Sequence, residues 1–405
     1  MALNTALSGI NAAQSDLNVI ANNIANANTT GFKGSRAEFS DIYAVTGLNL
    51  SSTAVGSGTY LQDVAQQFTQ GDITTTNNSL DLAISGNGFF VVNDGSGNTY
   101  TRAGDFQQDQ NGYVTTTSGA KLQVYPPNGI GGFDTSTLTD LRLVTNQSNA
   151  SATTQLTMTS NLPASATVPT NAFSTSDSTS YNAATPVTVY DSQGGSHQAT
   201  VYYVKTGTNT WNANLYVDGQ DAGTQALTFD SSGALSSPTN GVLNFNSVTL
   251  GNGSSPLTLS MNVTNTTQYG TAYSAGTITQ NGYEAGTLSS VNIDSNGIVT
   301  ANYSNNQTVQ LGQVAIANFA NTQGLAQVGN TSWSATTNSG PAVMGTAGVG
   351  QFGSLQSGAL ESSNTSDTTA QLVDMIQAQR NYQANAQVLS TDNTMTSSLF
   401  NAISR

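Results

Sequence analysis

Apolar residues follow a helical period only near the two ends of the chain. In the first segment, steps of three and four residues place apolar side chains in one heptad seam, until Gly31 supplies a stop signal. The same stepping returns in the last segment, where Thr368 and Gln371 have the spacing of a capping box. The pattern predicts one helix of about 25 residues and a longer one near the C-terminus. The seam residues that we expect to take part in self-assembly through these helices are Leu3, Leu7, Ile10, Leu17, Ile24, Leu372, Met375, Tyr382, Leu389 and Phe400.

Both predicted helices have outer faces of small, uncharged residues. The first 30 residues contain one charged side chain, Asp16, and residues 365–405 contain five. A solvated helix normally carries Glu and Lys on its outer face. Faces without them suit packing on several sides in a bundle of many chains, and a helix pair inside one monomer is the alternative. Because one seam buries few apolar side chains while about 60 residues must be ordered, we expect neighbouring subunits to complete the order of these ends.

Between these segments, apolar and polar residues alternate between Gly-rich turns, which predicts strands. Residues 79–92 contain two apolar runs broken by Gly86-Asn87-Gly88, which indicates a hairpin. Residues 146–283 are richer in Ser, Thr and Asn and indicate an all-β domain inserted into a loop of the first one. Strands are predicted there at 186–190, 200–205, 212–217 and 257–263.

The predicted fold is mainly β with α-helical termini and nested, discontinuous domains. The terminal helices form a coiled-coil-like pair, and two β-rich domains, barrel- or sandwich-like, follow, the second inserted in the first. The connection to the pair, with Gly47, Gly56 and Gly58, is interpreted as a compliant joint. The predicted bounds are 1–32 plus 362–405 for the helical domain, 33–71 for the linker, 72–145 plus 284–361 for the first β-domain and 146–283 for the inserted one.

Charged residues are scarce, at 7% of the chain, where ordinary domains have about 25%. Eight Lys and Arg residues and a net charge of -14 argue against binding to nucleic acid and against a polybasic membrane surface. The chain has no Cys and one His, His197, which excludes disulfides, thiolate metal sites and most general-base schemes. We therefore expect no enzyme, and no catalytic, cofactor or metal site.

The N-terminal segment lacks both a basic start and an unbroken apolar core, so it does not resemble a Sec signal peptide. No apolar run reaches the roughly 20 residues of a membrane span. We expect no membrane insertion, and any export by a route other than Sec.

Three polar motifs resemble sites but have simpler explanations. Residues 109–112 and 294–297 read Asp-x-Asn-Gly, like the start of a calcium loop, but lack its bidentate Glu, so hairpin turns are favoured. Residues 191–197 hold Asp, Ser and His within one turn, whereas a catalytic triad takes its members from separate elements. Lys33 and Arg36 precede two acidic residues, which favours a salt-bridged linker.

Four stretches of the sequence have the form of a known signature. Residues 21–33 read ANNIANANTTGFK, and residues 358–385 include GALESSN and QLVDMIQAQRNYQAN. Together with residues 79–90 and 100–106, they closely resemble the bacterial flagellar axial proteins of the rod and hook. The usual S-N-V-D of that family is replaced by the segment 363–367, SNTSD. The resemblance assigns the family signature to Asn22, Asn23, Asn26, Gly31, Phe32, Lys33, Arg380, Asn381 and Tyr382.

The inserted segment separates hook from rod within this family. Residues 187–197 and Trp211 resemble the outer domain of hook subunits, whereas rod subunits are generally shorter. The resemblance implies a structural subunit that polymerises with its own copies into a helical tube, a universal joint that transmits torque from rod to filament. It also implies rod, hook cap and hook–filament junction proteins as partners, passage through the flagellar type III export apparatus, and an extracellular place in the hook and basal body. Another axial protein, such as a distal rod or junction subunit, and a secreted β-rich glycan-binding protein remain as alternatives.

Overall fold

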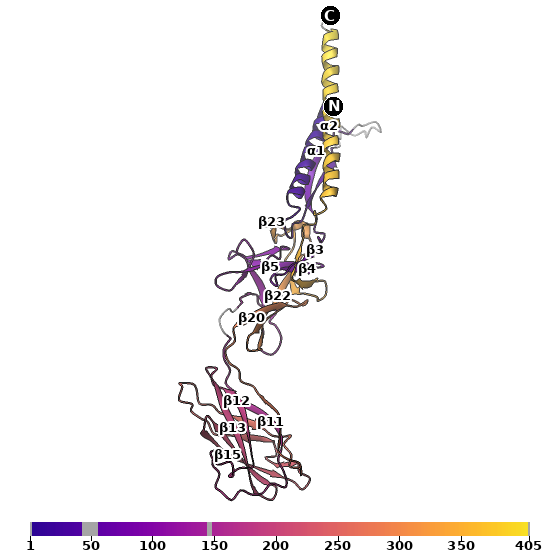
Figure 1. The fold of residues 1–405 in the computed structure, drawn as a ribbon. Coiled ribbons are helices and arrows are strands. Elements are labelled where there is room, and N and C mark those ends of the chain that lie inside the picture. Colours follow the sequence, from indigo (N-terminus) through magenta and orange to yellow (C-terminus); the bar gives the residue numbers. More distant parts are fainter. Residues whose placement is uncertain (1, 43–55, 144–147, 404–405) are drawn as a thin grey trace. The chain divides into compact units, whose positions relative to one another are not determined.

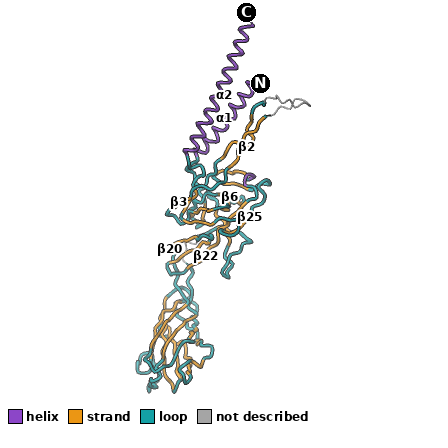
Figure 2. The backbone as a smooth tube through the Cα atoms, turned by 90° about the vertical axis from the view of Figure 1, so that its right-hand side faces the viewer, coloured by secondary structure: helices purple, strands orange, loops and turns teal. Residues whose placement is uncertain are grey.

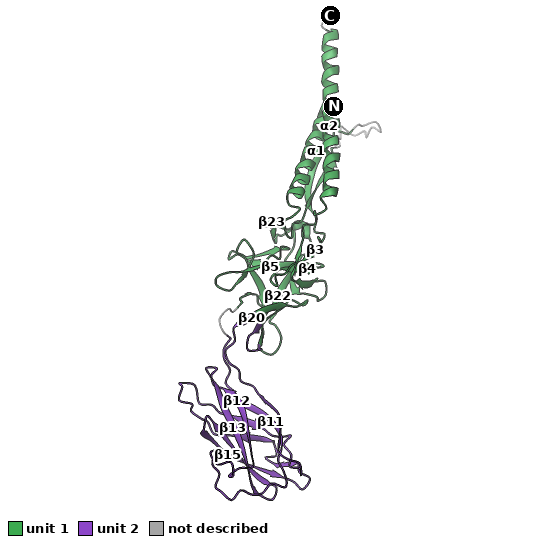
Figure 3. Ribbon diagram, in the orientation of Figure 1, with its two compact units in different colours: residues 1–143, 290–301, 308–405 green, residues 144–289, 302–307 purple. Residues whose placement is uncertain are grey.

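The chain folds into two compact units, each with a hydrophobic core of its own (Figure 3). The computed structural model describes residues 2–42, 56–143 and 148–403. Unit 1 contains both helices and a β-part, and unit 2 contains the predicted insertion. Unit 1 comprises residues 1–143, 290–301 and 308–405, and unit 2 comprises residues 144–289 and 302–307.

Two helices lie at the ends of the chain, α1 (Ala2–Ala25) and α2 (Thr368–Ile403). They pack antiparallel, because Asn23 Nδ2 donates to Gln371 Oε1 at one end of the pair while Gly9 lies against Asn385 at the other. Both chain ends therefore lie at the same end of the pair (Figure 1). With 36 residues against 24, α2 extends past the start of α1. Neither helix is long and apolar enough, over its described residues, to span a membrane.

The start of α2 differs from the predicted capping box. Asp367 Oδ1 accepts hydrogen bonds from the backbone N–H groups of residues 369–370 at 3.1 and 3.2 Å, so Asp367 rather than Thr368 is the N-cap. A carboxylate is a strong acceptor and is favoured at the positive end of a helix. The side chain of Gln371 binds Asn23 of α1 instead of closing the box.

The segment predicted as a linker contains an antiparallel hairpin. β1 (Ser35–Asp41) pairs with β2 (Thr59–Gln66), and the hairpin packs along α1 (Figure 2). Gly56 and Gly58 lie just before β2, and Gly47 lies outside the described residues. The high Gly and Ser content of this segment concealed its strand periodicity, so the hairpin was missed.

A 12-stranded sheet forms the centre of the β-part of unit 1. Its strands are β5 (Phe89–Asn93), β6 (Asn98–Thr101), β7 (Gln107–Gln108), β8 (Val114–Thr115), β9 (Lys121–Tyr125), β10 (Thr139–Asp140), β20 (Leu288–Ile293), β21 (Ile298–Tyr303), β22 (Thr308–Asn318), β23 (Ala326–Gly329), β24 (Ser332–Ser334) and β25 (Val343–Thr346). The main order is β20-β21-β22-β9-β5-β6-β24-β23. Phe90 and Val92 enter one core while Phe89 and Val91 enter another, so β5 is buried on both faces.

Two short strand pairs connect this sheet to the segment before α2. β4 pairs with β26, and β3 pairs with β27, both antiparallel. Glu361 is the last residue of β27, and α2 begins shortly after it in the sequence. The bounds are β3 (Ile73–Thr75), β4 (Leu82–Ser85), β26 (Ser354–Ser357) and β27 (Ala359–Glu361).

The predicted hairpin around Gly86-Asn87-Gly88 was wrong. β4 pairs with β26, whereas β5 pairs with β6, β9 and β22, so the turn passes between two sheets. Gly86 and Gly88 both have positive φ, +109° and +128°, so the prediction of a turn at these glycines is correct. The prediction that the two flanking strands pair with each other is the part that failed. The turns predicted at Asp109 and Asp294 are confirmed, since each carboxylate accepts two backbone N–H groups within its own loop, at 2.7 to 2.9 Å.

Unit 2 consists of two sheets around one core. Its strands are β11 (Gln155–Asn161), β12 (Ala183–Tyr190), β13 (Ser196–Gly207), β14 (Thr210–Val217), β15 (Gln220–Phe229), β16 (Leu235–Ser237), β17 (Val242–Asn244), β18 (Ser260–Asn262) and β19 (Ser274–Gln280). One sheet has the order β12-β13-β14-β15-β16 and the other β17-β18-β11-β19. Trp211 is fully buried between them, and its Nε1 donates to Gln268 Oε1 at 3.0 Å. The predictions at 186–190, 200–205 and 212–217 are confirmed, and the one at 257–263 yields only the short β18.

Candidate functional site

The helix pair is joined through small side chains rather than through the predicted seam. The buried residues of α1 are Ala6, Ala13, Ile20 and Asn23, on the same side as Gly9. A Cβ added to Gly9 would lie 2.7 Å from the side chain of Asn385, which shows how closely the helices approach. On α2 the one buried residue in the described range is Ala378. The contact residues of α1 therefore recur at heptad spacing, but each lies one position before a residue of the predicted seam.

The larger apolar residues of the predicted seam remain at the surface of the single chain. Leu3 and Leu7 are 41% and 48% exposed, and Leu372, Tyr382 and Phe400 are 48%, 37% and 70% exposed. A shift of one residue turns a helical face by about 100°, which moves these side chains out of the intramolecular contact. The other predicted seam residues, Ile10, Leu17, Ile24, Met375 and Leu389, are half-buried.

The last turns of α2 carry the most exposed apolar side chains of either helix. Met395, Leu399, Phe400 and Ile403 are 60% to 74% exposed. Residues 393–403 contain no charged side chain, although a helix in water normally presents charges on such a surface. Contiguous apolar surface of this kind marks a contact with another molecule.

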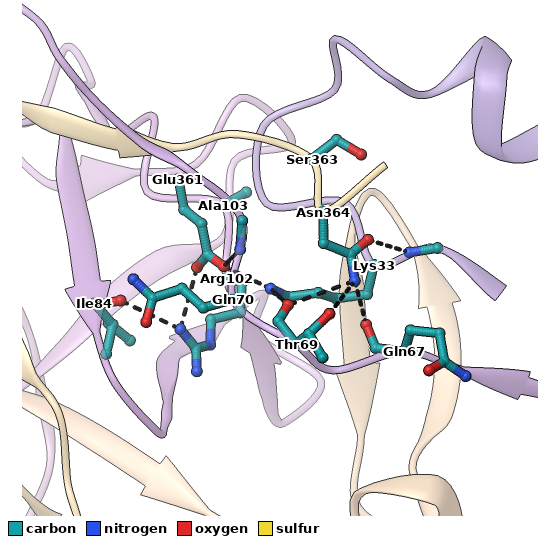
Figure 4. A network of polar contacts seen from close by, with 12 residues as sticks. Lys33, Gln67, Thr69, Gln70, Ile84, Arg102, Ala103, Glu361, Ser363 and Asn364 are labelled. Carbon is teal, nitrogen blue, oxygen red and sulfur yellow. Dashed lines mark hydrogen bonds and ion pairs between the residues drawn. The ribbon is translucent and has the colours of Figure 1, made fainter. Parts of the chain in front are cut away.

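A buried charge network fixes the base of the helix pair to the β-part (Figure 4). Lys33 Nζ lies 2.5 Å from Glu361 Oε1 and donates to the carbonyl of Thr69 at 2.8 Å. Arg102 donates from Nη1 to Glu361 Oε2 at 3.1 Å and from Nη2 to the carbonyl of Gly86 at 2.7 Å. Three segments that are far apart in the sequence thus meet at one carboxylate.

The network depends on Glu361 because two cations share its single negative charge. The side chains of Lys33 and Glu361 have no exposed surface, and that of Arg102 is 5% exposed. Burial lowers the pKa of Lys33 and of Arg102, while the charge of Glu361 acts in the opposite direction and favours their charged forms. Removal of the carboxylate would leave two buried charges without compensation, which is strongly destabilising.

The prediction that Lys33 forms a salt bridge with the acidic residues just after it in the linker was wrong. Lys33 is buried against Glu361, more than 300 residues away in the sequence, and local spacing could not reveal this partner. The prediction is confirmed for Arg36, which pairs with Glu38 at 2.8 Å on the surface. Arg102 and Glu361 were overlooked as site residues. The signal for them was a lone charge inside an otherwise uncharged motif, YTRAG for Arg102 and GALE for Glu361.

The asparagines of the N-terminal signature hold the end of α1. Asn23 Oδ1 accepts from the backbone N–H of Ser35 at 2.9 Å, and its Nδ2 donates to the carbonyl of Ser35 at 2.8 Å. The backbone carbonyl of Asn23 accepts from the Thr365 hydroxyl at 3.0 Å. Asn26 Nδ2 donates to the carbonyl of Asn22 at 3.0 Å, within the last turn. These bonds fix the angle at which α1 joins the hairpin.

Gly31 and Phe32 belong to the same junction. Gly31 has φ +66°, and a Cβ at this position would lie 2.4 Å from the backbone nitrogen of Ala103. Its backbone N–H donates to the carbonyl of Glu361 at 2.8 Å, so only glycine fits between these two segments. Phe32 is buried beside it.

The C-terminal part of the signature lies elsewhere. Arg380, Asn381 and Tyr382 are exposed on α2 and do not take part in the charge network. The predicted signature therefore occupies two places, one that anchors the helix pair and one that remains on its surface.

His197 has no catalytic arrangement around it. Its Nδ1 lies 2.6 Å from Asp218 Oδ2, and its Nε2 lies 3.1 Å from Asp191 Oδ2. Both nitrogens are held by carboxylates, so neither is free to act as a base toward a hydroxyl. Burial lowers the pKa of His197, but the hydrogen bonds to Asp218 and Asp191 outweigh it and raise the pKa above its ordinary value. The sequence motif around His197 includes Asp191, but it gave no indication of Asp218, which lies in the turn after β14.

Models of four flagellar families match successive parts of the chain. They are the flagella basal body rod protein at residues 3–33, the flagellar hook protein FlgE/F/G D1 domain at 83–178, the flagellar basal body protein FlaE D2 domain at 161–283, and the flagellar basal body rod FlgEFG protein C-terminal region at 356–402. The matches thus include both helices, the β-part and the inserted segment.

Full-length relatives give the same result. The flagellar hook protein FlgE of Escherichia coli K12 is 42% identical, over 99% of this chain and 100% of the relative. That of Salmonella typhimurium LT2 is 40% identical, also over 99% and 100%, and that of Rhizobium meliloti is 34% identical over 98% of each. The crystal structure of Helicobacter pylori flagellar hook protein FlgE2 shares the fold, with a TM-score of 0.52 at 14% identity over 71% of this chain and 100% of that one. The chain belongs to the flagellar hook protein family.

Proposed function

We propose that this chain is the structural subunit of a bacterial flagellar hook, and that its copies assemble into a helical tube through the terminal helices. The observation that carries the proposal is that small and large apolar side chains lie on different faces of these helices. Small residues join α1 to α2 within a chain, and the large apolar residues stay exposed. Similarity to hook proteins over the whole length, including the inserted segment, supports a hook subunit rather than a distal rod or junction subunit.

The exposed apolar surface provides the driving force for assembly. Complete burial of one large apolar side chain is worth about 1.5–3 kcal/mol, and each helix pair exposes several of them. A patch that binds a different patch on the next copy continues from copy to copy and produces a helical polymer. The helices therefore line the inner part of the tube in this proposal.

The junction and the outer surfaces serve the two mechanical tasks of a universal joint. The buried network at Glu361 couples the helices rigidly to the β-part, which supports transmission of torque. The β-surfaces carry mostly Ser, Thr, Asn and Gln, in a chain with 7% charged residues. Contacts between such surfaces exchange easily as the tube bends, because no desolvated ion pair has to be broken.

The partners and location follow from the same proposal. The ends of the tube contact rod, hook cap and hook–filament junction proteins, and the polymer is extracellular. The subunit passes largely unfolded through the flagellar type III export apparatus, and a chain without Cys forms no disulfide that would oppose unfolding. Its role is structural rather than enzymatic.

Truncation of α2 tests the proposal. A chain lacking residues 366–405 retains Glu361 and should keep both β-regions folded while losing polymerisation, as measured by sedimentation and electron microscopy. A second variant lacking residues 146–283 is the matched control and should still form tubes, with altered curvature or stability. Tubes formed by the chain without 366–405 would contradict the proposal.

A further inference from the structure

A cavity of about 510 Å³ lies between the helix pair and the β1–β2 hairpin of unit 1. Val19 and Ile20 of α1 and Phe39 of β1 form an apolar wall, and Asp16 and Asp374 line the same space. Ile20 is itself 6% exposed, whereas Phe39 remains 39% exposed, so the chain leaves the Phe39 part of this wall uncovered.

The two carboxylates of the cavity have no cation of their own. Asp16 comes from α1 and Asp374 from α2, and burial, followed by the charge of Asp374, raises the pKa of Asp16. Arg36 also lines the cavity, but its guanidinium is bound to Glu38 at 2.8 Å. Two like charges therefore face one cavity without a partner among the described residues.

Arg380 is the complementary group. Among the cations that the structure describes, it alone makes neither an ion pair nor a hydrogen bond. It lies two positions from Ala378, the buried contact residue of α2, and therefore on the opposite side of the helix. Val373 and Ile376, 58% and 50% exposed, share its face at helical spacing. The other described cations are bound, namely Lys33, Arg36, Arg102 and Lys121 in ion pairs, and Arg142 and Lys205 to backbone carbonyls.

We propose that Arg380 of one copy enters this cavity in a neighbouring copy and pairs there with Asp16 and Asp374, while Val373 and Ile376 cover its apolar wall. The inference rests on the proposed polymer and names one of its contacts. An apolar wall with two anions matches an apolar stripe with one cation, and the occupant is a second copy because Arg380 and Asp374 face different sides of one helix. Donor and acceptor are different patches, so the contact continues along a polymer.

Charge reversal in the full chain tests the pairing. Arg380→Glu should raise the critical concentration for polymerisation at least about 30-fold, because it places a third negative charge at the cavity. Arg142→Glu, an exposed reversal in the β-part, is the matched control and should polymerise normally. The double variant Arg380→Glu with Asp374→Arg should restore assembly, since it exchanges the charges between copies. Normal assembly of Arg380→Glu with intact helical circular dichroism, or no recovery in the double variant, would overturn the inference.

Cross-linking provides a second test that does not depend on charge. The chain has no native Cys, so Asp374→Cys with Arg380→Cys introduces the only two thiols. These positions lie on different sides of one helix and cannot form a disulfide within a chain. Oxidised polymers should give covalent multimers on a denaturing gel, whereas each single variant, and the pair Asp392→Cys with Arg380→Cys, should not. Wild-type polymers without cross-linking in the 374–380 variant reject this contact alone, and failure of the wild-type chain to polymerise rejects the proposed function as well.

Discussion

Unit 2 and the terminal helices of unit 1 treat apolar residues in opposite ways. In unit 2, two sheets enclose a continuous core around Trp211 and Tyr203, and the large apolar residues that stay exposed in its described part are Val168 and Tyr269. On the helices, the contact between α1 and α2 buries mainly small residues, while leucines, valines and aromatic residues face outward. Unit 2 thus encloses its large apolar residues within the single chain, whereas the helices leave many of theirs uncovered.

The base of the helices differs from unit 2 in a second respect. Apolar burial accounts for the closure of unit 2, although the charged residues Asp191 and Lys205 are buried there as well. The junction of the helices closes around Lys33, Arg102 and Glu361, which are buried as charges. A charged junction is sensitive to the loss of one group, because the remaining charges cannot return to water without opening the structure.

The largest effect is expected from Glu361→Gln. The amide keeps the size and one acceptor of the side chain but removes its charge, so unit 1 should lose about 3–5 kcal/mol of stability while unit 2 stays unchanged. The two tryptophans report separately, because Trp211 lies in unit 2 and Trp333 in unit 1. Urea unfolding followed by fluorescence in Trp211→Phe and Trp333→Phe backgrounds measures each unit alone.

Glu38→Gln is the matched control for this prediction. It removes the same charge from an exposed pair with Arg36, and such pairs contribute about 0–1 kcal/mol. If the two variants lose equal stability, the buried network does not hold unit 1 closed, and the contrast with unit 2 fails.

A smaller effect, in unit 2 rather than in unit 1, is expected from a rise in pH. His197 of unit 2 is held between Asp191 and Asp218, which raises its pKa above the ordinary 6.5. A raised pKa in the folded state means that this stabilisation is complete below about pH 6.5 and is lost as the pH rises through the higher folded value. The melting temperature of unit 2 should therefore fall by a few degrees between pH 6 and pH 9, with no matching change in unit 1.

His197→Gln isolates the contribution of the imidazole. In this variant the melting temperature of unit 2, followed through Trp211, should not show the loss between pH 6 and pH 9. A wild-type unit 2 that gains stability over this range would contradict the sign of the shift.

The helices, the all-β character of the rest and the nested order could be predicted because each depends on local periodicity. The two helices were predicted from apolar residues at steps of three and four, and strands such as β13 and β14 were predicted from the alternation of apolar and polar residues. The face of α1 that contacts α2 could not be predicted, because the large apolar residues lie on another face and the intramolecular contact uses Ala6, Gly9 and Ala13. Small residues of this kind give no hydrophobic signal.

The partners within the candidate site could not be predicted for a different reason. Lys33 and Glu361 are at opposite ends of the sequence, and only the pairing of β27 with β3 brings the carboxylate to the junction. The same holds for His197, whose second carboxylate, Asp218, arrives through the register of β13 and β14. Sequence signatures identified Lys33 as part of a motif, but they did not indicate that it is buried.

The smallest effect on the folded monomer is expected from Leu399→Ser with Phe400→Ser. This double variant also tests most directly whether the exposed apolar residues of the helices differ from the rest of the surface. Both side chains are at least 60% exposed at the free end of α2, so the stability of the monomer should change by less than about 0.5 kcal/mol. Polymerisation, measured by sedimentation at increasing concentration, should nevertheless be lost. Ile130→Ser, which alters a side chain that is 90% exposed in the β-part, is the matched control and should assemble normally. If the α2 variant polymerises as well as the control, exposure of apolar residues on the helices does not distinguish them from the rest of the surface, and assembly depends on other contacts.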